Sequence, residues 1–233
     1  IEHWSILIIG LFLILCNFFK KKKFNDKGLV NIGLFILIFL IILASFYHKI
    51  PYFYNWQIFQ KYSIGNGSEF SLWINFDKFI FIYIASLFFI KELTPNNQKL
   101  TLNNKYHTII LFISTILFLM ISSLLIGLVK IEVKFDYILP LWALNNLLIV
   151  CVAEELFFRG FLQINLTNYF YKFKNKENIS IFITSFIFAT LHLFLGWKFA
   201  LISFFASIFY GLAFKITKDI KYPILLHFLV NLT

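Results

Sequence analysis

Long runs of apolar residues alternate with short polar segments along the whole chain. The runs are too long for strands of a membrane barrel. A backbone in lipid must also satisfy its own amides and carbonyls, so these runs are expected to form α-helices. The pattern predicts eight helices, at about residues 4–19, 28–47, 76–92, 107–129, 139–170, 180–195, 199–216 and 222–233. We therefore expect an all-α fold, a polytopic transmembrane bundle of about eight helices.

One connection between the predicted helices is long and aromatic. Residues 48–75 contain Tyr, Phe and Trp at many positions. Aromatic rings with a polar edge are enriched where a membrane meets water, so we expect an interfacial loop here. A gate for substrate access is the alternative role of this segment.

The composition supports a membrane protein. The chain has 233 residues, of which 60% are hydrophobic, 21% aromatic and only 14% charged, too few for a water-soluble core to hide the rest. The net charge of +10 comes from lysines in the connections, a placement that favours a multi-pass protein in the lipid bilayer over a nucleic-acid partner. The frequent Ile, Phe, Asn and Lys indicate an AT-rich genome, hence a bacterial inner (cytoplasmic) membrane.

Three charged side chains interrupt one predicted membrane helix, in the stretch AEELFFRG at residues 153–160. An intramembrane carboxylate costs about 3 kcal/mol, so Glu154 and Glu155 are candidates for function. Glu155 lies four residues before Arg159, on the same face of an α-helix, which predicts an ion pair. Glu154 points about 100° away. With no cation of its own, it is expected to exchange a proton near neutral pH, as a general base or acid does. A structural network of the three charges is the alternative.

Two histidines lie inside predicted helices. His192 closes the stretch FATLH, and His227 opens HFLVN, which places Asn231 on the same face four residues later. A glutamate beside one histidine can take a proton from water, while the second histidine and the amide can stabilise an oxyanion. This set suffices for amide hydrolysis without a covalent intermediate. Cys151 is a candidate nucleophile, although a buried cysteine is more often a small hydrophobic residue.

Three motifs occur in order on three of the last four predicted membrane segments: E-E-x-x-x-R (Glu154, Glu155, Arg159), F-x-x-x-H (Phe188, His192) and H-x-x-x-N (His227, Asn231). Together they resemble the CPBP family of CAAX proteases and bacteriocin-processing enzymes, also called the abortive-infection family. Its best-known members are the type II CAAX prenyl endopeptidases. The resemblance covers roughly residues 140–233.

The resemblance implies a glutamic-type intramembrane protease of eight helices. It implies that Glu154 and His192 activate water, that Glu155 and Arg159 support the site, and that His227 and Asn231 form the oxyanion hole. Family substrates include prenylated C-terminal tails and leader or sorting peptides. The chain then divides into N-terminal transmembrane helices (residues 1–138) and C-terminal catalytic helices (residues 139–233) within one membrane domain.

We therefore expect an intramembrane endopeptidase that hydrolyses a bond near the end of a membrane-associated or lipid-modified protein, or of a leader or sorting peptide, without a cofactor. One alternative is a zinc protease with Glu154, His192 and His227 as ligands, although the HExxH spacing is absent. A proton relay or transporter also uses buried charges, but paired helices broken by Gly or Pro are missing from the pattern. A non-catalytic immunity protein with the same fold is the third alternative.

Overall fold

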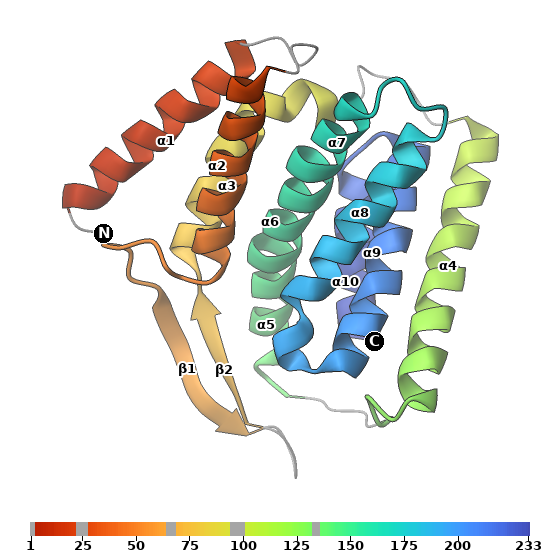
Figure 1. The fold of residues 1–233 in the computed structure, drawn as a ribbon. Helices are drawn as coiled ribbons and strands as arrows, with labels where there is room; N and C mark the ends of the chain where they lie inside the picture. The colour runs from red at the N-terminus through yellow and green to blue at the C-terminus, as the bar shows by residue number, and fades with distance from the viewer. Residues whose placement is uncertain (1–2, 22–27, 64–68, 94–100, 132–135) are drawn as a thin grey trace. The chain divides into compact units, whose positions relative to one another are not determined.

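The computed structural model describes residues 3–21, 28–63, 69–93, 101–131 and 136–233 (Figure 1). Within these ranges it contains a helix at each of the eight predicted positions, so the all-α class is confirmed. The helices are α1 (His3–Lys21), α2 (Leu29–Phe46), α3 (Phe76–Leu93), α4 (Leu102–Leu125), a continuous helical run over residues 139–169, α8 (Lys176–Leu191), α9 (Trp197–Thr217) and α10 (Lys221–Leu232).

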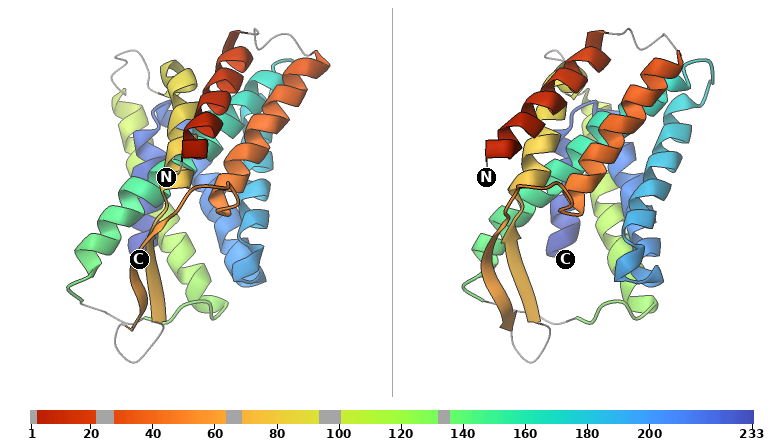
Figure 2. Two further views of the ribbon diagram at one scale, coloured as in Figure 1. Left: turned by 90° about the vertical axis from the view of Figure 1, so that its left-hand side faces the viewer. Right: turned by 60° about the vertical axis from the view of Figure 1, so that its left-hand side comes forward.

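The aromatic segment at residues 48–75 contains two strands in place of part of the expected loop, and its position at the membrane interface stays a prediction. Strands β1 (Trp56–Ser63) and β2 (Glu69–Ile74) pair antiparallel in a two-stranded sheet that follows α2 and leads into α3 (Figure 2). Residues 64–68 of this segment lie outside the described residues. Tyr62 of β1 donates a hydrogen bond to the carboxylate of Asp136, at 3.2 Å. The hydrogen bond with Tyr137, followed by burial and by Asp136, raises the pKa of Tyr62, so its hydroxyl keeps the proton that it donates.

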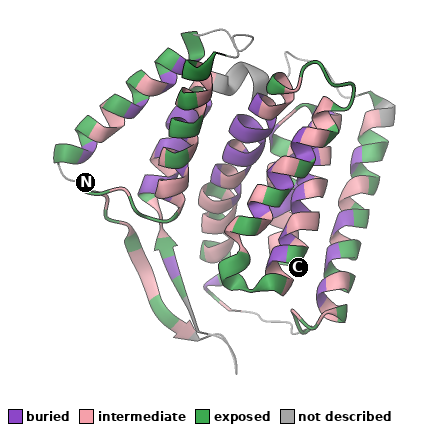
Figure 3. Ribbon diagram, viewed as in Figure 1, coloured by how far each residue is buried: buried purple, intermediate pink, exposed green. Residues whose placement is uncertain are grey.

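Four helices of the described residues are long and apolar enough to cross a membrane, namely α1, α2, α4 and α9. On α4, several apolar residues are exposed and two polar residues are buried, the reverse of the arrangement on a helix of a water-soluble protein (Figure 3). Ile109, Ile113 and Ile121 are exposed, whereas Thr108 and Thr115 are buried. An apolar face turned outward needs lipid to cover it, and the small polar residues bond to carbonyls of their own helix. The protein is therefore an integral membrane protein.

Contacts divide the chain into two compact units. Unit 1 comprises residues Ile1–Phe89 and Lys134–Phe157, and unit 2 comprises Ile90–Val133 and Phe158–Thr233. These units are defined by contacts and differ from the two parts expected from the sequence, residues 1–138 and 139–233. The expected division is based on the motifs and stays a prediction. The two glutamates of the first motif belong to unit 1, and the other motif residues belong to unit 2.

Aromatic packing holds unit 1 together. Phe81 of α3 packs edge-on against Phe12 of α1, with ring centroids 5.0 Å apart. Phe157 packs on two rings of α2, those of Phe39 at 5.5 Å and Phe46 at 5.2 Å. These contacts fix α2 beside the helical stretch that carries the glutamates, because bulky rings in contact restrict sliding of the helices.

Unit 2 packs around α9, which contacts α4, α8 and α10. Small residues on α9 let neighbouring helices approach closely. A Cβ placed on Gly211 would lie 3.0 Å from Ile181 of α8 and 3.1 Å from the Gln163 side chain. The same side of α9 carries Ser207 one turn earlier, within reach of Arg159 at 2.8 Å. The close approach therefore brings α9 to the motif-bearing helices of its unit.

Candidate active site

The helical run over residues 139–169 changes its winding around the two glutamates. Two of its segments, η1 (Asn146–Cys151) and η2 (Leu156–Gln163), are π-helical, and between them the four residues of α6 (Val152–Glu155) are α-helical. Segments α5 (Leu139–Asn145) and α7 (Ile164–Tyr169) complete the run. A π-helix has more residues in each turn, so the rule that positions four apart share a face does not carry over to Glu155 and Arg159. Their ion pair stays a prediction.

Glu154 has a cation beside it, contrary to expectation. The Nζ atom of Lys78 on α3 lies 2.9 Å from Glu154 Oε1. The Lys78 side chain is 9% exposed and that of Glu154 12%. The ammonium also lies 4.3 Å from the ring centroid of Phe46, a cation–π contact. Glu154 therefore has a cationic partner, which lies on a different helix, α3.

A second acidic side chain supports the start of α3. Asp77 is buried, accepts a hydrogen bond from the backbone N–H of Lys78 at 2.8 Å, and lies 3.0 Å from His48 Nδ1. The Asn55 amide is 2.8 Å from the same ring nitrogen. The contacts form one polar chain that joins Asn55, His48, Asp77, Lys78 and Glu154.

Lys78 is a candidate site residue that was not predicted from the sequence. The lysine lies 76 positions before its partner Glu154. Its signal is the pair Asp77-Lys78 at the beginning of an apolar helix, where two adjacent charges enter a predicted span. The sequence therefore indicates that Lys78 is buried, but it does not indicate that Glu154 is its partner.

Arg159 is fully buried in unit 2. Its Nη2 donates to both the carbonyl oxygen and the hydroxyl of Ser207, each at 2.8 Å. The guanidinium carbon lies 5.7 Å from the ring centroid of Phe188 and 5.4 Å from that of Tyr210. The arginine thus joins α9 to the ring of the F-x-x-x-H motif, and its supporting role in the site stays a prediction.

His192 lies at the end of α8 rather than within a helix. The helix ends at Leu191 instead of the expected residue 195, and Gly196 turns the chain with a φ of 104°. The ring stacks on Phe188 at 4.4 Å, and Nδ1 lies 2.7 Å from the Phe188 carbonyl oxygen. A carbonyl only accepts, so Nδ1 carries the hydrogen. In the neutral ring, Nε2 is then the nitrogen that can accept a proton.

His227 lies in α10 and is buried against two rings of unit 2. It stacks on Tyr210 at 4.7 Å, with 18° between the planes, and its centroid is 6.2 Å from that of Phe188. Asn231 lies four residues later on the same α-helix, hence on the same face. Unit 2 therefore brings Arg159, His192 and His227 together around Phe188 and Tyr210. The meeting of Glu154 with His192 stays a prediction.

Two alternatives from the sequence are a cysteine nucleophile and a zinc site. Cys151 is fully buried and its thiol donates to the Asn146 side chain at 3.2 Å, as a structural cysteine does. Within the described ranges, no three His, Cys, Asp or Glu side chains are grouped so as to hold a metal ion. The expectation that no cofactor is needed stays a prediction.

Residues 136–233 match the model of the family described as type II CAAX prenyl endopeptidase Rce1-like. The match runs from just before α5 to the end of the chain, so it includes all three motifs. The resemblance drawn from these motifs is thereby confirmed for this part of the chain. No curated protein and no solved structure matches the chain.

Proposed function

We propose that the protein is an intramembrane endopeptidase, because residues 136–233 form a domain of the Rce1-like family of type II CAAX prenyl endopeptidases. The observation that carries the proposal is that Glu154, His192, His227 and Asn231 all fall within the matched residues. The substrate is a membrane-associated or lipid-modified protein, or a leader or sorting peptide, cleaved near its end. The location that we propose is a bacterial inner membrane.

In the proposed reaction, Glu154 removes a proton from a water molecule while His192 holds that water through Nε2. The water oxygen bonds to the carbon of the scissile carbonyl, and negative charge develops on the carbonyl oxygen. His227 and Asn231 stabilise this oxyanion with hydrogen bonds. The carbon–nitrogen bond then breaks, and the proton held by Glu154 passes to the leaving amine.

Two observations support these roles. The Nδ1 hydrogen of His192 is directed to the Phe188 carbonyl, which leaves Nε2 as the acceptor that the water step needs. Lys78 lies 2.9 Å from Glu154, and a fixed cation orients the carboxylate. Lys78 is therefore a positioning residue in this proposal.

The decisive experiment is peptide hydrolysis by the full-length protein in liposomes, with a prenylated fluorogenic peptide and an unprenylated leader-type peptide. Glu154→Gln is expected to lower kcat by about 10³-fold, because an amide cannot take the proton. His227→Ala and Asn231→Ala are each expected to lower kcat by about 10²-fold through loss of an oxyanion donor. Glu92→Gln changes a carboxylate near the end of α3, outside the motifs, and serves as the matched control.

Normal cleavage by the Glu154→Gln protein would remove glutamate from the mechanism. Cleavage of neither peptide by the parent protein, together with proton flux across the liposome that depends on Glu154, would favour a proton relay instead. Cleavage of only the prenylated peptide would indicate processing of prenylated tails, and cleavage of only the unprenylated peptide would indicate processing of leader peptides.

A further inference from the structure

Unit 2 contains a cavity of about 560 Å³ between α4, α8 and the C-terminal end of α9. None of its lining residues belongs to the three motifs. Its polar part is formed by Asn104 and His107 of α4, Glu177 of α8, and Lys215 and Lys218 at the end of α9. The volume lies within the range of about 300–1,000 Å³ that small-molecule sites occupy.

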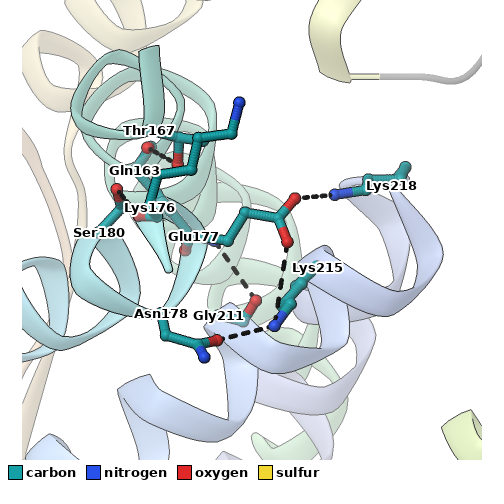
Figure 4. Close-up of polar contacts among 9 residues, drawn as sticks. All are labelled: Gln163, Thr167, Lys176, Glu177, Asn178, Ser180, Gly211, Lys215 and Lys218. Carbon is teal, nitrogen blue, oxygen red and sulfur yellow. Dashed lines mark hydrogen bonds and ion pairs between the residues drawn. The ribbon is translucent and has the colours of Figure 1, made fainter. Parts of the chain in front are cut away.

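The polar part of the cavity carries more positive than negative charge. Lys218 Nζ lies 2.6 Å from one oxygen of Glu177, and Lys215 Nζ lies 3.9 Å from the other (Figure 4). Lys215 also donates to Asn178 at 2.7 Å. Two ammonium groups against one carboxylate leave a net charge of +1 (2 − 1), and each ammonium has three N–H donors. The carboxylate therefore holds both cations without saturating them, and an anion can share their remaining donors.

The other part of the cavity is apolar and continues into the membrane face of α4. Ile110 and Leu111 line it about one helical turn beyond His107, at the beginning of the candidate span Asn104–Leu125. Ile110 is 45% exposed, and the neighbouring Ile109 and Ile113 belong to the outward apolar face of α4. A ligand that satisfies both parts has an anionic head group joined to an apolar chain.

We propose that this cavity binds one anionic glycerophospholipid. The phosphate accepts from the N–H donors of Lys215 and Lys218 that Glu177 leaves available, and one acyl chain lies along Ile110 and Leu111. Lysine is a common phosphate ligand, and basic pockets between membrane helices bind anionic head groups. The site is separate from the motif residues, so this proposal does not depend on protease activity.

The test is native mass spectrometry of the full-length protein in mixed micelles that contain equal amounts of phosphatidylglycerol and phosphatidylcholine with identical acyl chains. The parent protein is expected to retain one phosphatidylglycerol in preference to phosphatidylcholine. Lys215→Gln and Lys218→Gln are each expected to lower that preference about fivefold. Lys20→Gln with Lys21→Gln, in the last turn of α1, is the matched control and is expected to leave the preference unchanged.

Glu177→Gln tests whether the lysine variants lose lipid because the positive charge is lost or because the ion pairs that support the local fold are lost. It removes the same ion pairs as the lysine variants but makes the cavity more positive, so retention of phosphatidylglycerol is expected to rise about fivefold. Equal retention of the two lipids, an unchanged preference in both Lys215→Gln and Lys218→Gln, or weaker binding in Glu177→Gln would each overturn the proposal. Displacement of the lipid by millimolar inorganic phosphate would show a site for free phosphate instead.

Discussion

The contact between Lys78 and Glu154 changes how the candidate base is understood. Burial alone would disfavour a charged carboxylate, whereas an ammonium at 2.9 Å offsets that cost. The neighbouring Asp77 and His48 hold the start of α3, so the lysine is fixed at both its backbone and its head group. In the proposed mechanism, Glu154 therefore depends on a side chain that no motif contains.

Removal of the Lys78 charge is predicted to lower kcat about 10–100-fold with little change in KM. The reason is that Lys78→Met leaves the general base without the cation that orients it. Lys78→Arg restores a cation at this position and is expected to recover most of the activity. Steady-state kinetics of the reconstituted protein measure both parameters, with Lys105→Met on α4 as a lysine control.

Stability provides an independent measurement of the same pair. Lys78→Met is expected to lower the free energy of unfolding by about 3 kcal/mol, because it leaves a carboxylate in a largely buried site. The double variant with Glu154→Gln is expected to recover most of this loss. An Arg variant as inactive as Lys78→Met, at unchanged stability, would argue against positioning by charge.

The helices were predicted from the sequence more accurately than the β-hairpin and the end of α8, and each difference has a physical reason. The eight helices are predicted because an apolar run in lipid has few other structures available to it. The β-hairpin was interpreted as a loop, although Asn66-Gly67 between two aromatic stretches is a recognised turn signal. The end of α8 at Leu191 was placed four residues too late, because the apolar run continues through the short 3₁₀ turn η3 (Leu193–Leu195).

Helix packing in unit 2 is predicted to depend on the absence of a side chain at Gly211. Gly211→Val adds three carbon atoms where even a Cβ meets Ile181 at 3.0 Å, so the free energy of unfolding is expected to fall by about 1–3 kcal/mol. Gly33→Val on α2 makes the same change where nothing lies within 4 Å. Thermal unfolding in detergent is expected to show a lower Tm only for Gly211→Val. Equal shifts in the two variants would mean that helix propensity, not packing, decides the result.

At the scale of the whole molecule, the sequence predicts the family resemblance of residues 136–233 better than it predicts the contacts between helices. The three motifs name six site residues, and unit 2 places three of them, Arg159, His192 and His227, around shared aromatic rings. Motif spacing reports faces of single helices, however, and contacts between helices are set by tertiary packing. That is why Lys78 and the π-helical winding on both sides of Glu154 were not foreseen.

The protein is predicted to cleave peptide without a bound metal ion. The Lys78 ammonium beside Glu154 repels a divalent cation at that carboxylate, and the described residues contain no cluster of three metal-binding side chains. Elemental analysis of active protein is expected to show no stoichiometric zinc, and chelators are expected to leave kcat unchanged. Loss of activity on chelation, with recovery on adding zinc, would support the metal alternative.

The position of Lys78 also bears on any attempt to shorten this protein. The lysine lies outside residues 136–233, so a fragment cut to the matched region keeps every motif yet omits the counter-charge of Glu154. Grafting the catalytic helices onto another scaffold would accordingly require that scaffold to supply an ammonium or guanidinium at the same point. If the proposed mechanism holds, the smallest active fragment is therefore expected to extend beyond residues 136–233.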